Sequence, residues 1–299
     1  MNSHELCNQY IVTRYFLQKD SQMSINDFLQ TQPRTNNSIF SDLLFALCER
    51  SYMPVNIRRS EFRLYFFKQL SAQRILLKFA RWKDGVWRNA TDKDIQAQNI
   101  DDYPFSYIIV DIGQQLFLIQ RNNEITPLVE SLISLVQKSF SFLLSDERMQ
   151  ITFSPITEKG VFWDIVEKNA GKIHTIEFEL LSPNFLGQSY TANQLMKELR
   201  RDTNTESLKM TLKNESGKLK INKSIPFYSV LLEYISNGGG KWNLHIRGNR
   251  KPATSEESVF ETTIDTAHME SSDTDAPLKE TFDTIASIEE QNHNSEEKK

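Results

Sequence analysis

The sequence predicts an α+β protein in which mixed and antiparallel sheets carry flanking helices, followed by a disordered acidic tail. Strand-like segments rich in aromatic and β-branched residues come in adjacent pairs and do not alternate regularly with helices. Amphipathic helical segments fall between these pairs. From Lys251 onward, Ser, Thr, Asp and Glu dominate and apolar residues are too sparse to offset the entropy of ordering the chain.

The first half predicts strands, two helices and a buried hairpin. The strands are QYIVTRYFLQ (9–18), EFRLYFFKQL (61–70) and RILLKFARW (74–82). The helices are INDFLQ (25–30), capped by Ser24, and SIFSDLLFALCER (38–50). KDGVW (83–87) predicts an Asp-Gly turn, and 101–122 a hairpin that turns at Gly113. Thr126-Pro127 opens a helix that runs to about residue 144.

The second half repeats the mixture. Strands are expected at 149–156 and 172–184, helices at 161–169, 191–202 and 226–237, and a hairpin from SLKMTLKN (207–214) and GKLKINKS (217–224). The predicted organisation is an N-terminal α/β domain (1–145), a C-terminal α+β domain (146–251) and the tail (252–299). Within the tail we expect disorder over 252–276 and a short helix over 277–290, which either docks or is a solvated segment with transient helicity.

The stretch NGGGKWNLHIRGNRK (237–251) resembles a phosphate-binding loop but does not match one. A Walker loop requires glycine at position 235 and a hydroxyl residue at 242, where the chain has Ile235 and Trp242. The glycines also follow a predicted helix, and the carbonyl end of a helix repels phosphate. We therefore predict a turn, with Gly238 as a left-handed helix terminator.

Charge is distributed unevenly along the chain. The tail carries 4 lysines and 13 acidic residues, a net charge of −9, whereas the first 250 residues carry 31 basic and 26 acidic residues, a net charge of +5. Strand alternation predicts one basic sheet face with few acidic residues, formed by Lys209, Lys213, Lys218, Lys220, Lys241, His245 and Arg247. Such a face either binds a polyanion or keeps an exposed sheet soluble and unpaired.

A second basic cluster lies in the N-terminal half. It contains Arg58, Arg59, Arg63, Arg74, Arg81 and Arg88, with Lys78, Lys83, Trp82 and Trp87 interleaved. Arginines beside exposed aromatic rings suit phosphate contacts and base stacking. The alternative is that the tryptophans belong to the core and the charges between them are solvated.

Motifs that carry chemistry are weak in this sequence. The five histidines are scattered and the two cysteines, Cys7 and Cys48, lie in no metal-like spacing, so we assign no catalytic residue, metal ligand or cofactor. Glu177 and Glu179 alternate on a strand without the lysine of a metal-dependent nuclease and are expected on its solvated face. No secretory signal or membrane-spanning run is apparent, which predicts a cytoplasmic protein without membrane insertion.

The order of elements resembles that of the RexA type of phage exclusion proteins. The resemblance covers about residues 9–185 and is carried by YIVTRYF, INDFLQ, RLYFFKQL, YIIVDIGQQLFLIQRN, the helix after Thr126-Pro127, QITFSPI and KIHTIEFELLSPN. It implies a cytoplasmic, dimeric phage-defence protein that contacts nucleic acid without strong sequence preference.

Together these features predict an anti-phage defence protein that binds nucleic acid, DNA more than RNA, and forms a homo-oligomer. Two other readings remain: an interaction module that meets a protein partner through the tail, and a nuclease with a split metal site. The acidic tail is also expected to compete with nucleic acid for the basic face.

Overall fold

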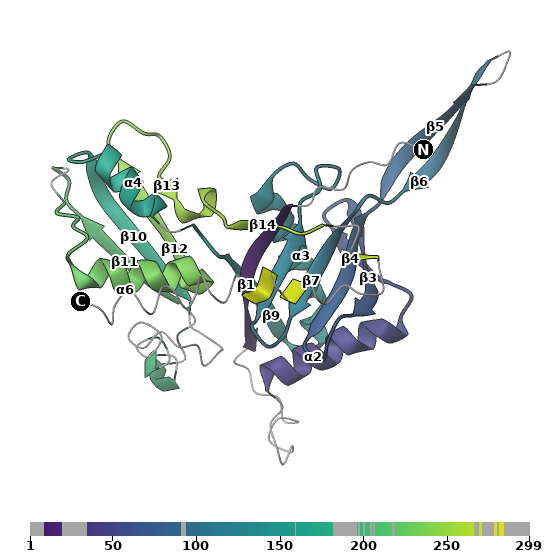
Figure 1. The fold of residues 1–299 in the computed structure, drawn as a ribbon, viewed down its shortest axis with the longest axis horizontal. Coiled ribbons are helices and arrows are strands. Elements are labelled where there is room, and N and C mark those ends of the chain that lie inside the picture. Colours follow the sequence, from purple (N-terminus) through teal and green to yellow (C-terminus); the bar gives the residue numbers. More distant parts are fainter. Residues whose placement is uncertain are drawn as a thin grey trace. The chain divides into compact units, whose positions relative to one another are not determined.

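The computed structural model of the protein describes residues 9–19, 35–90, 94–158, 160–181, 207–216 and 219–265, and short pieces at 196, 198–199, 201–203, 205, 269–270, 278–279 and 281–283. It is an α+β structure of antiparallel sheets and several helices, so the predicted fold class is confirmed (Figure 1). The chain forms two compact units: unit 1 is Met1–Tyr10 with Leu17–Ile151, and unit 2 is Ile11–Phe16 with Thr152–Lys299. Among the described residues, no helix is long and apolar enough to cross a membrane.

The largest sheet has eight strands in the order β14–β1–β8–β7–β4–β3–β2, with β9 also pairing with β1. Its strands are β1 (Gln9–Lys19), β2 (Met53–Ile57), β3 (Ser60–Gln69), β4 (Arg74–Arg81), β7 (Phe105–Asp111), β8 (Leu116–Gln120), β9 (Met149–Pro155) and β14 (Glu261–Thr263). The strands predicted from sequence and the hairpin through Gly113 are confirmed. Every residue of β8 is buried, as its unbroken apolar run predicts.

Two helices pack on this sheet through aromatic side chains. They are α2 (Asn36–Ala46), followed by a 3-10 turn over Leu47–Glu49, and α3 (Val129–Leu143). Phe117 of β8 lies 6.3 Å from Phe40 of α2 and 5.0 Å from Phe140 of α3, measured between ring centroids. Thr35 caps α2 by accepting a hydrogen bond from the Ser38 amide at 3.1 Å.

Two local predictions in this region need correction. The helix after Thr126-Pro127 begins at Val129, because Leu128 still has an extended backbone. Asp84-Gly85 is not a turn but lies inside β5 (Lys83–Ala90), which pairs with β6 (Ile95–Asp102) over eight residue pairs. Gly85 faces Ile100, and a Cβ there would lie 3.2 Å from the Ile100 side chain, so close approach across the ladder explains the glycine. The predicted helix at 25–30 lies outside the described residues.

Unit 2 is built on a four-stranded antiparallel sheet in the order β11–β10–β12–β13. Its strands are β10 (Ile173–Leu181), β11 (Ser207–Lys213), β12 (Gly240–Ile246) and β13 (Ala253–Thr254), and its helices are α4 (Val161–Lys168) and α6 (Pro226–Tyr234). Phe178 and Trp242 lie opposite each other on β10 and β12 and join Phe162 of α4 and Tyr228 of α6 in one core. The alternation predicted for β12, with Trp242, Leu244 and Ile246 inward, is confirmed by their burial.

The hairpin predicted from 207–214 and 217–224 is wrong in its second strand. β11 pairs with β10, and residues 219–222 form no strand. A turn follows β11 at Asn214, whose side chain accepts a hydrogen bond from the Ser216 amide at 3.1 Å. Lys218 lies outside the described residues.

The expectation of disorder from residue 252 is also wrong for the first part of the tail. Residues 253–254 pair with β12, Ser255–Glu257 form a 3-10 turn and Glu261–Thr263 form β14. These residues add to existing sheet edges, where backbone hydrogen bonds order a chain that has few apolar side chains. Farther on, Leu278 and Phe282 are helical and fully buried, so this part of the tail is a docked segment and not a solvated one.

Candidate nucleic-acid interface

The glycine-rich stretch is a helix terminator, as predicted. A π-type turn over Ile235–Gly239 follows α6, and Gly238 adopts a left-handed conformation with φ 80° and ψ 20°. Arg14 Nε donates a hydrogen bond of 2.9 Å to the Asn237 carbonyl, which places a cation at the negative end of the helix. The stretch therefore has the polarity that disfavours an anion.

The open face of the four-stranded sheet is charge-balanced, contrary to the expectation of few acidic residues. Register places Glu179 of β10 between Lys209 of β11 and Lys241 of β12. The cations on or beside this face are Lys209, Lys213, Lys241 and Arg247, and the carboxylates are Glu177, Glu179, Glu215 and Glu256. The sequence hid this balance because the carboxylates come from β10 and from two loops.

Glu177 is the central group of this face. Its carboxylate lies 3.2 Å from Lys209 Nζ and 3.6 Å from His245 Nε2. The hydrogen bond from Lys209 lowers the pKa of Glu177 below its ordinary value, with a smaller effect from His245. The ring of His245 is 6.0 Å from that of His174 on β10. Lys209 and Lys241 on either side of Glu177 and Glu179 make this surface zwitterionic.

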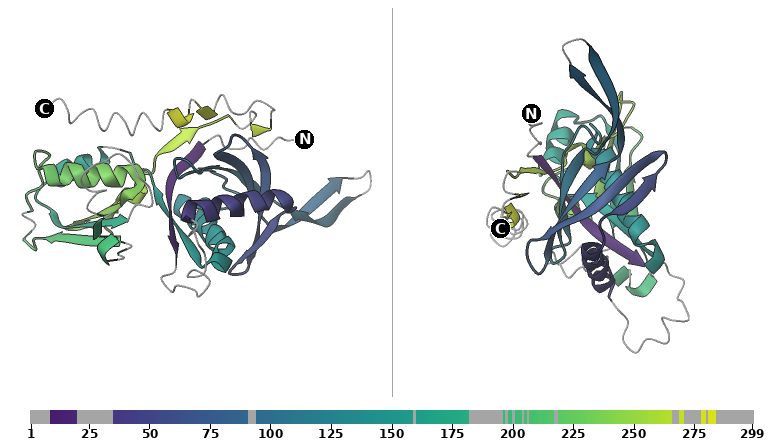
Figure 2. Two further views of the ribbon diagram at one scale, coloured as in Figure 1. Left: turned by 90° about the horizontal axis from the view of Figure 1, so that it is seen from below. Right: turned by 90° about the vertical axis from the view of Figure 1, so that its right-hand side faces the viewer.

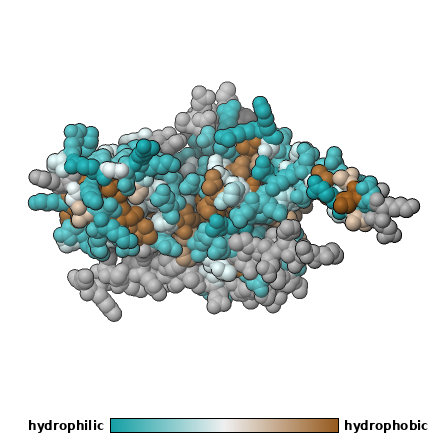
Figure 3. Space-filling view, turned by 90° about the horizontal axis from the view of Figure 1, so that it is seen from above, coloured by the Kyte–Doolittle hydropathy of each residue, from teal (hydrophilic) through white to brown (hydrophobic). Residues whose placement is uncertain are grey.

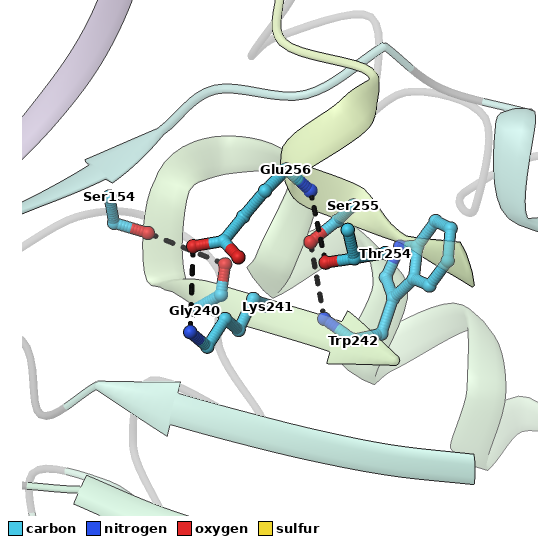
Figure 4. Close-up of polar contacts among 7 residues, drawn as sticks. All are labelled: Ser154, Gly240, Lys241, Trp242, Thr254, Ser255 and Glu256. Atoms are coloured by element: carbon cyan, nitrogen blue, oxygen red, sulfur yellow. Dashed lines mark hydrogen bonds and ion pairs between the residues drawn. The ribbon is translucent and has the colours of Figure 1, made fainter. Parts of the chain in front are cut away.

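Lys241 lines a small pocket at one end of the sheet. Figure 4 shows its ion pair with Glu256 and the neighbouring hydrogen bonds. The pocket has a volume of about 100 Å³, and its lining includes Ser154, Glu179, Lys241 and Glu256. Lys241 Nζ is 3.4 Å from a Glu256 carboxylate oxygen, and Ser154 Oγ donates to the Gly240 carbonyl at 3.3 Å. Lys241 is thus paired with the carboxylate of Glu256, which belongs to the 3-10 turn at Ser255–Glu257 in the tail.

The remaining predicted residues of unit 2 do not extend the face. Lys213 pairs with Glu215 at 2.9 Å, and Arg247 donates to the Glu215 carbonyl at 3.0 Å. Lys220 is exposed in a loop outside the sheet. The predicted set therefore does not form one basic surface among the described residues.

The arginines of the N-terminal cluster do not share one environment. Arg58 and Arg59 form the exposed turn between β2 and β3, and Arg58 has φ 58°. Arg74 makes a 2.7 Å ion pair with buried Asp111, and Arg81 donates to the Ile125 carbonyl at 2.8 Å, so both tie elements together.

The interleaved tryptophans and Arg88 are not part of one platform. Trp82 donates from Nε1 to Asp101 at 3.0 Å. Trp87 and Arg88 are exposed on the β5–β6 hairpin. This hairpin has its own charge pattern, in which acidic residues outnumber basic ones among the described residues.

A different group of side chains does gather on one face of β3, β4 and β7. We call it the aromatic–cation face, and it comprises Tyr52, Arg63, Tyr65, Phe67, Lys78, Tyr103, Phe105 and Tyr107. The strand register produces it, since Lys78 lies between Tyr65 and Tyr107 in one cross-strand row. The next row places small Ala80 between Arg63 and Phe105.

Both cations of this face contact aromatic rings. The Arg63 guanidinium carbon lies 4.5 Å from the Tyr52 ring centroid and 4.3 Å from that of Tyr103. Lys78 Nζ lies 4.1 Å from the Phe67 centroid and 4.7 Å from the Phe105 centroid. These distances are within the range of cation–π attraction, which holds both cations at the sheet surface.

The electrostatics of this region are basic. Residues 52–81 contain seven basic side chains and one acidic side chain, Glu61. Arg63 Nε donates a hydrogen bond of 2.7 Å to the Glu61 carboxylate, and this bond, with a further one to Tyr65, raises the pKa of Arg63. The guanidinium is thus permanently charged and fixed in orientation. Its side chain keeps 21% of its surface exposed.

Sequence reasoning identified Arg63 and missed the rings around it. The signal was available in part, because Arg63, Tyr65 and Phe67 alternate along EFRLYFFKQL, and alternate residues of a strand share one face. Tyr52, Tyr103 and Phe105 come from other segments and join only through the sheet register. Among the described residues, no group of three or more His, Cys, Asp or Glu side chains is placed to hold a metal ion.

Comparison of the chain with protein-family models, with curated proteins and with solved structures found no match. The candidate function therefore depends on the geometry of the two units.

Proposed function

We propose that the protein binds single-stranded nucleic acid with little sequence preference through the aromatic–cation face of unit 1. The observation that carries the proposal is the interleaving of Arg63 and Lys78 with six aromatic rings on one face of the sheet. Tyr107 is buried beneath this face, and the other five rings keep part of their surface exposed. Proteins that bind single strands combine cations that follow the backbone with rings on which bases stack.

The exposed side chains of this region offer two kinds of contact to a nucleic acid. Tyr52, with 39% of its surface exposed, offers a ring face to a base, and Tyr65 lies beside it at 5.5 Å between centroids. Arg58 and Arg59, exposed at the end of the same β2–β3 hairpin, offer two phosphate contacts. Ring faces and point charges suit every base and every phosphate, which supports low sequence preference.

The charge balance of unit 2 supports assigning the binding to unit 1. Lys209, Lys213 and Lys241 each lie within 3.4 Å of a carboxylate oxygen, so a phosphate must compete with an existing partner. The β2–β3 turn presents two adjacent cations, and the nearest acidic residue in sequence, Glu61, is paired with Arg63.

The test is binding of the full chain to labelled oligothymidine, oligouridine and duplex DNA over about 50–200 mM salt. Tyr52→Ala is expected to weaken binding to the single strands by about 1–3 kcal/mol, the value of one stacked base, or about 5- to 150-fold. Arg58→Ala with Arg59→Ala is expected to reduce the slope of log K against log salt by about 1.4. The matched control, Lys209→Ala with Lys213→Ala, removes the same charge from unit 2 and is expected to leave affinity unchanged.

Two results would contradict the proposal. One is the absence of binding to any of the three probes at low salt. The other is a loss of affinity in the unit 2 control that equals the loss in the Arg58 and Arg59 variant, because the lysine face would then be the binding surface.

The resemblance of the element order in the sequence to that of RexA-type proteins supports placing this binding in defence against phage. The corresponding measurement is the plating efficiency of a phage panel on bacteria that express the wild type or Tyr52→Ala. Equal protection by both, together with lost oligonucleotide binding in the variant, would separate defence from nucleic-acid binding.

A further inference from the structure

The β5–β6 hairpin is a two-stranded ribbon that extends from the rest of unit 1, as the three ribbon views show (Figures 1 and 2). Eight residue pairs run from Lys83 opposite Asp102 to Ala90 opposite Ile95. Large apolar side chains lie exposed along it: Val86 48%, Trp87 54%, Ile95 66% and Ile100 44%. Figure 3 shows hydrophobic surface, in brown, on this projecting hairpin.

This ribbon lacks the usual sources of stability. A two-stranded hairpin is marginal in water without a further strand or a helix to pack on. Neither outer edge pairs with another strand among the described residues, so two rows of backbone groups are open. Asp84 also lies directly opposite Asp101, an arrangement of like charges that destabilises a strand pair. These features indicate that an additional strand completes the ribbon.

The charge of the ribbon excludes a polyanion as that partner. Its described residues include two cations, Lys83 and Arg88, and four acidic residues, Asp84, Asp94, Asp101 and Asp102, for a net charge of −2. Nucleic acid is repelled by such a surface.

The pattern of β5 is complementary to itself. Asp84 and Arg88 lie two residues on either side of Val86 and share its face of the strand. Neither has an ion-pair partner within the described part of the chain. On the other face, Gly85 and Trp87 lie one residue on either side of Val86. A two-fold axis at Val86 would exchange the members of each pair.

We propose that β5 pairs edge to edge with β5 of a second copy of this chain, antiparallel about a two-fold axis at Val86. Each Asp84 then faces the partner's Arg88, and each Trp87 covers the partner's Gly85. The two Val86 side chains meet on the axis. The result is a continuous four-stranded sheet with two opposite-charge pairs, an isologous contact of the kind that closes dimers. Aromatic cover over a glycine in the adjacent strand is a recurrent stabilising device in sheets.

The β6 edge does not offer this match. Residues 95–102 contain Asp101 and Asp102 and no basic residue, so pairing β6 with itself leaves both carboxylates without a cation. The β5 edge is therefore the interface, and this inference is independent of the proposed nucleic-acid binding.

A charge exchange in the full chain tests the interface, with the dimer constant measured by analytical ultracentrifugation. Arg88→Asp alone, and Asp84→Arg alone, each replace two attractive pairs by two repulsive ones and are expected to raise the dissociation constant at least about tenfold. The double variant restores both pairs in reversed order and is expected to recover the dimer. Gln98→Asp with Asn99→Asp adds the same charge to β6 as Arg88→Asp adds to β5 and is expected to dimerise like the wild type.

A cysteine placed on the axis gives a geometric test that does not depend on charge. In a chain with Cys7→Ser and Cys48→Ser, Val86→Cys is expected to form an intermolecular disulfide, because opposed antiparallel residues have Cα atoms about 4.5–5.5 Å apart. Ala90→Cys, four residues from the axis, is expected to remain reduced. A monomeric wild type, a double charge variant that stays dissociated while each single variant folds, or equal cross-linking at 86 and 90 would overturn the proposal.

Discussion

Replacing Gly240 by alanine tests the glycine turn that leads into β12. Gly240 has φ 152° and pairs with Leu180 of β10. An added Cβ would lie 2.0 Å from the Glu179 carbonyl oxygen and 3.0 Å from the Leu180 Cα. Both are backbone atoms of the neighbouring strand, so the contact is relieved only if β10 and β12 separate.

The expected loss has two components. Forcing a methyl group into a packed site costs about 1–3 kcal/mol. Holding a non-glycine residue at this backbone conformation costs about 1–3 kcal/mol more. Gly240→Ala should therefore reduce the free energy of unfolding of unit 2 by about 2–6 kcal/mol. Gly248 provides the matched control, because it has φ 93° but no atom within 4 Å of an added Cβ. Gly248→Ala should cost only about 1–2 kcal/mol.

The assay is urea unfolding of the full chain followed by fluorescence, since Trp242 is buried two residues after Gly240. Hydrogen exchange of the β12 amides then assigns the change to this strand. If the two variants lower the free energy of unfolding by amounts within about 0.5 kcal/mol of each other, the reasoning is refuted, because β10 would then move away from the added methyl group without a measurable cost in free energy.

Three further predictions concern stability. Asp111→Ala leaves the largely buried Arg74 without its 2.7 Å partner and should destabilise the protein by about 3–5 kcal/mol in urea titrations, whereas Glu61→Gln, at a more exposed pair, should cost less than about 1 kcal/mol. Lys209 lowers the pKa of Glu177, so the Glu177 carboxylate stabilises the fold above its ordinary pKa, and this stabilisation is lost as pH falls through the lowered pKa. In thermal melts between about pH 5 and 3, the melting temperature should therefore fall less for Glu177→Gln than for the wild type. Parallel curves for the two proteins would contradict the coupling. Phe282→Ala should lower the free energy of unfolding by about 3–5 kcal/mol, because the Phe282 ring is fully buried. The control Lys279→Ala, at an exposed position of the same helical segment, should change it by no more than about 0.5 kcal/mol. Equal values for the two variants would show that the segment is not docked.

Local patterns were sufficient for most elements of the fold. Alternation in KWNLHI correctly identified the buried face of β12, and the unbroken apolar runs of 107–110 and 116–119 identified strands buried on both faces. Such patterns are reliable because each apolar side chain gains free energy when it leaves water, and buried positions recur with the period of the strand or helix. The prediction at Asp84-Gly85 failed because turn propensity is weak beside eight cross-strand pairs.

The candidate site depended on contacts that no local pattern contains. Six rings gather around Arg63 and Lys78 only because β3, β4 and β7 adopt one particular register, and Tyr103 lies forty residues beyond Arg63. The same holds for the tail segment at 253–263, which is ordered by the edges of sheets formed far earlier in the chain.

Sequence alone therefore determined most of the element types, the helix-terminating role of Gly238 and the overall excess of positive charge before residue 251. Tertiary structure decided where that charge is available. The positive charge of Lys209 and Lys241 is balanced because β10, between them, presents Glu177 and Glu179. Arg63 of β3, in contrast, lies against the rings of Tyr52 and Tyr103, which come from two other segments. Electrostatic and stacking energies depend on separations of a few ångströms, and strand pairing sets those separations between residues that are distant in sequence.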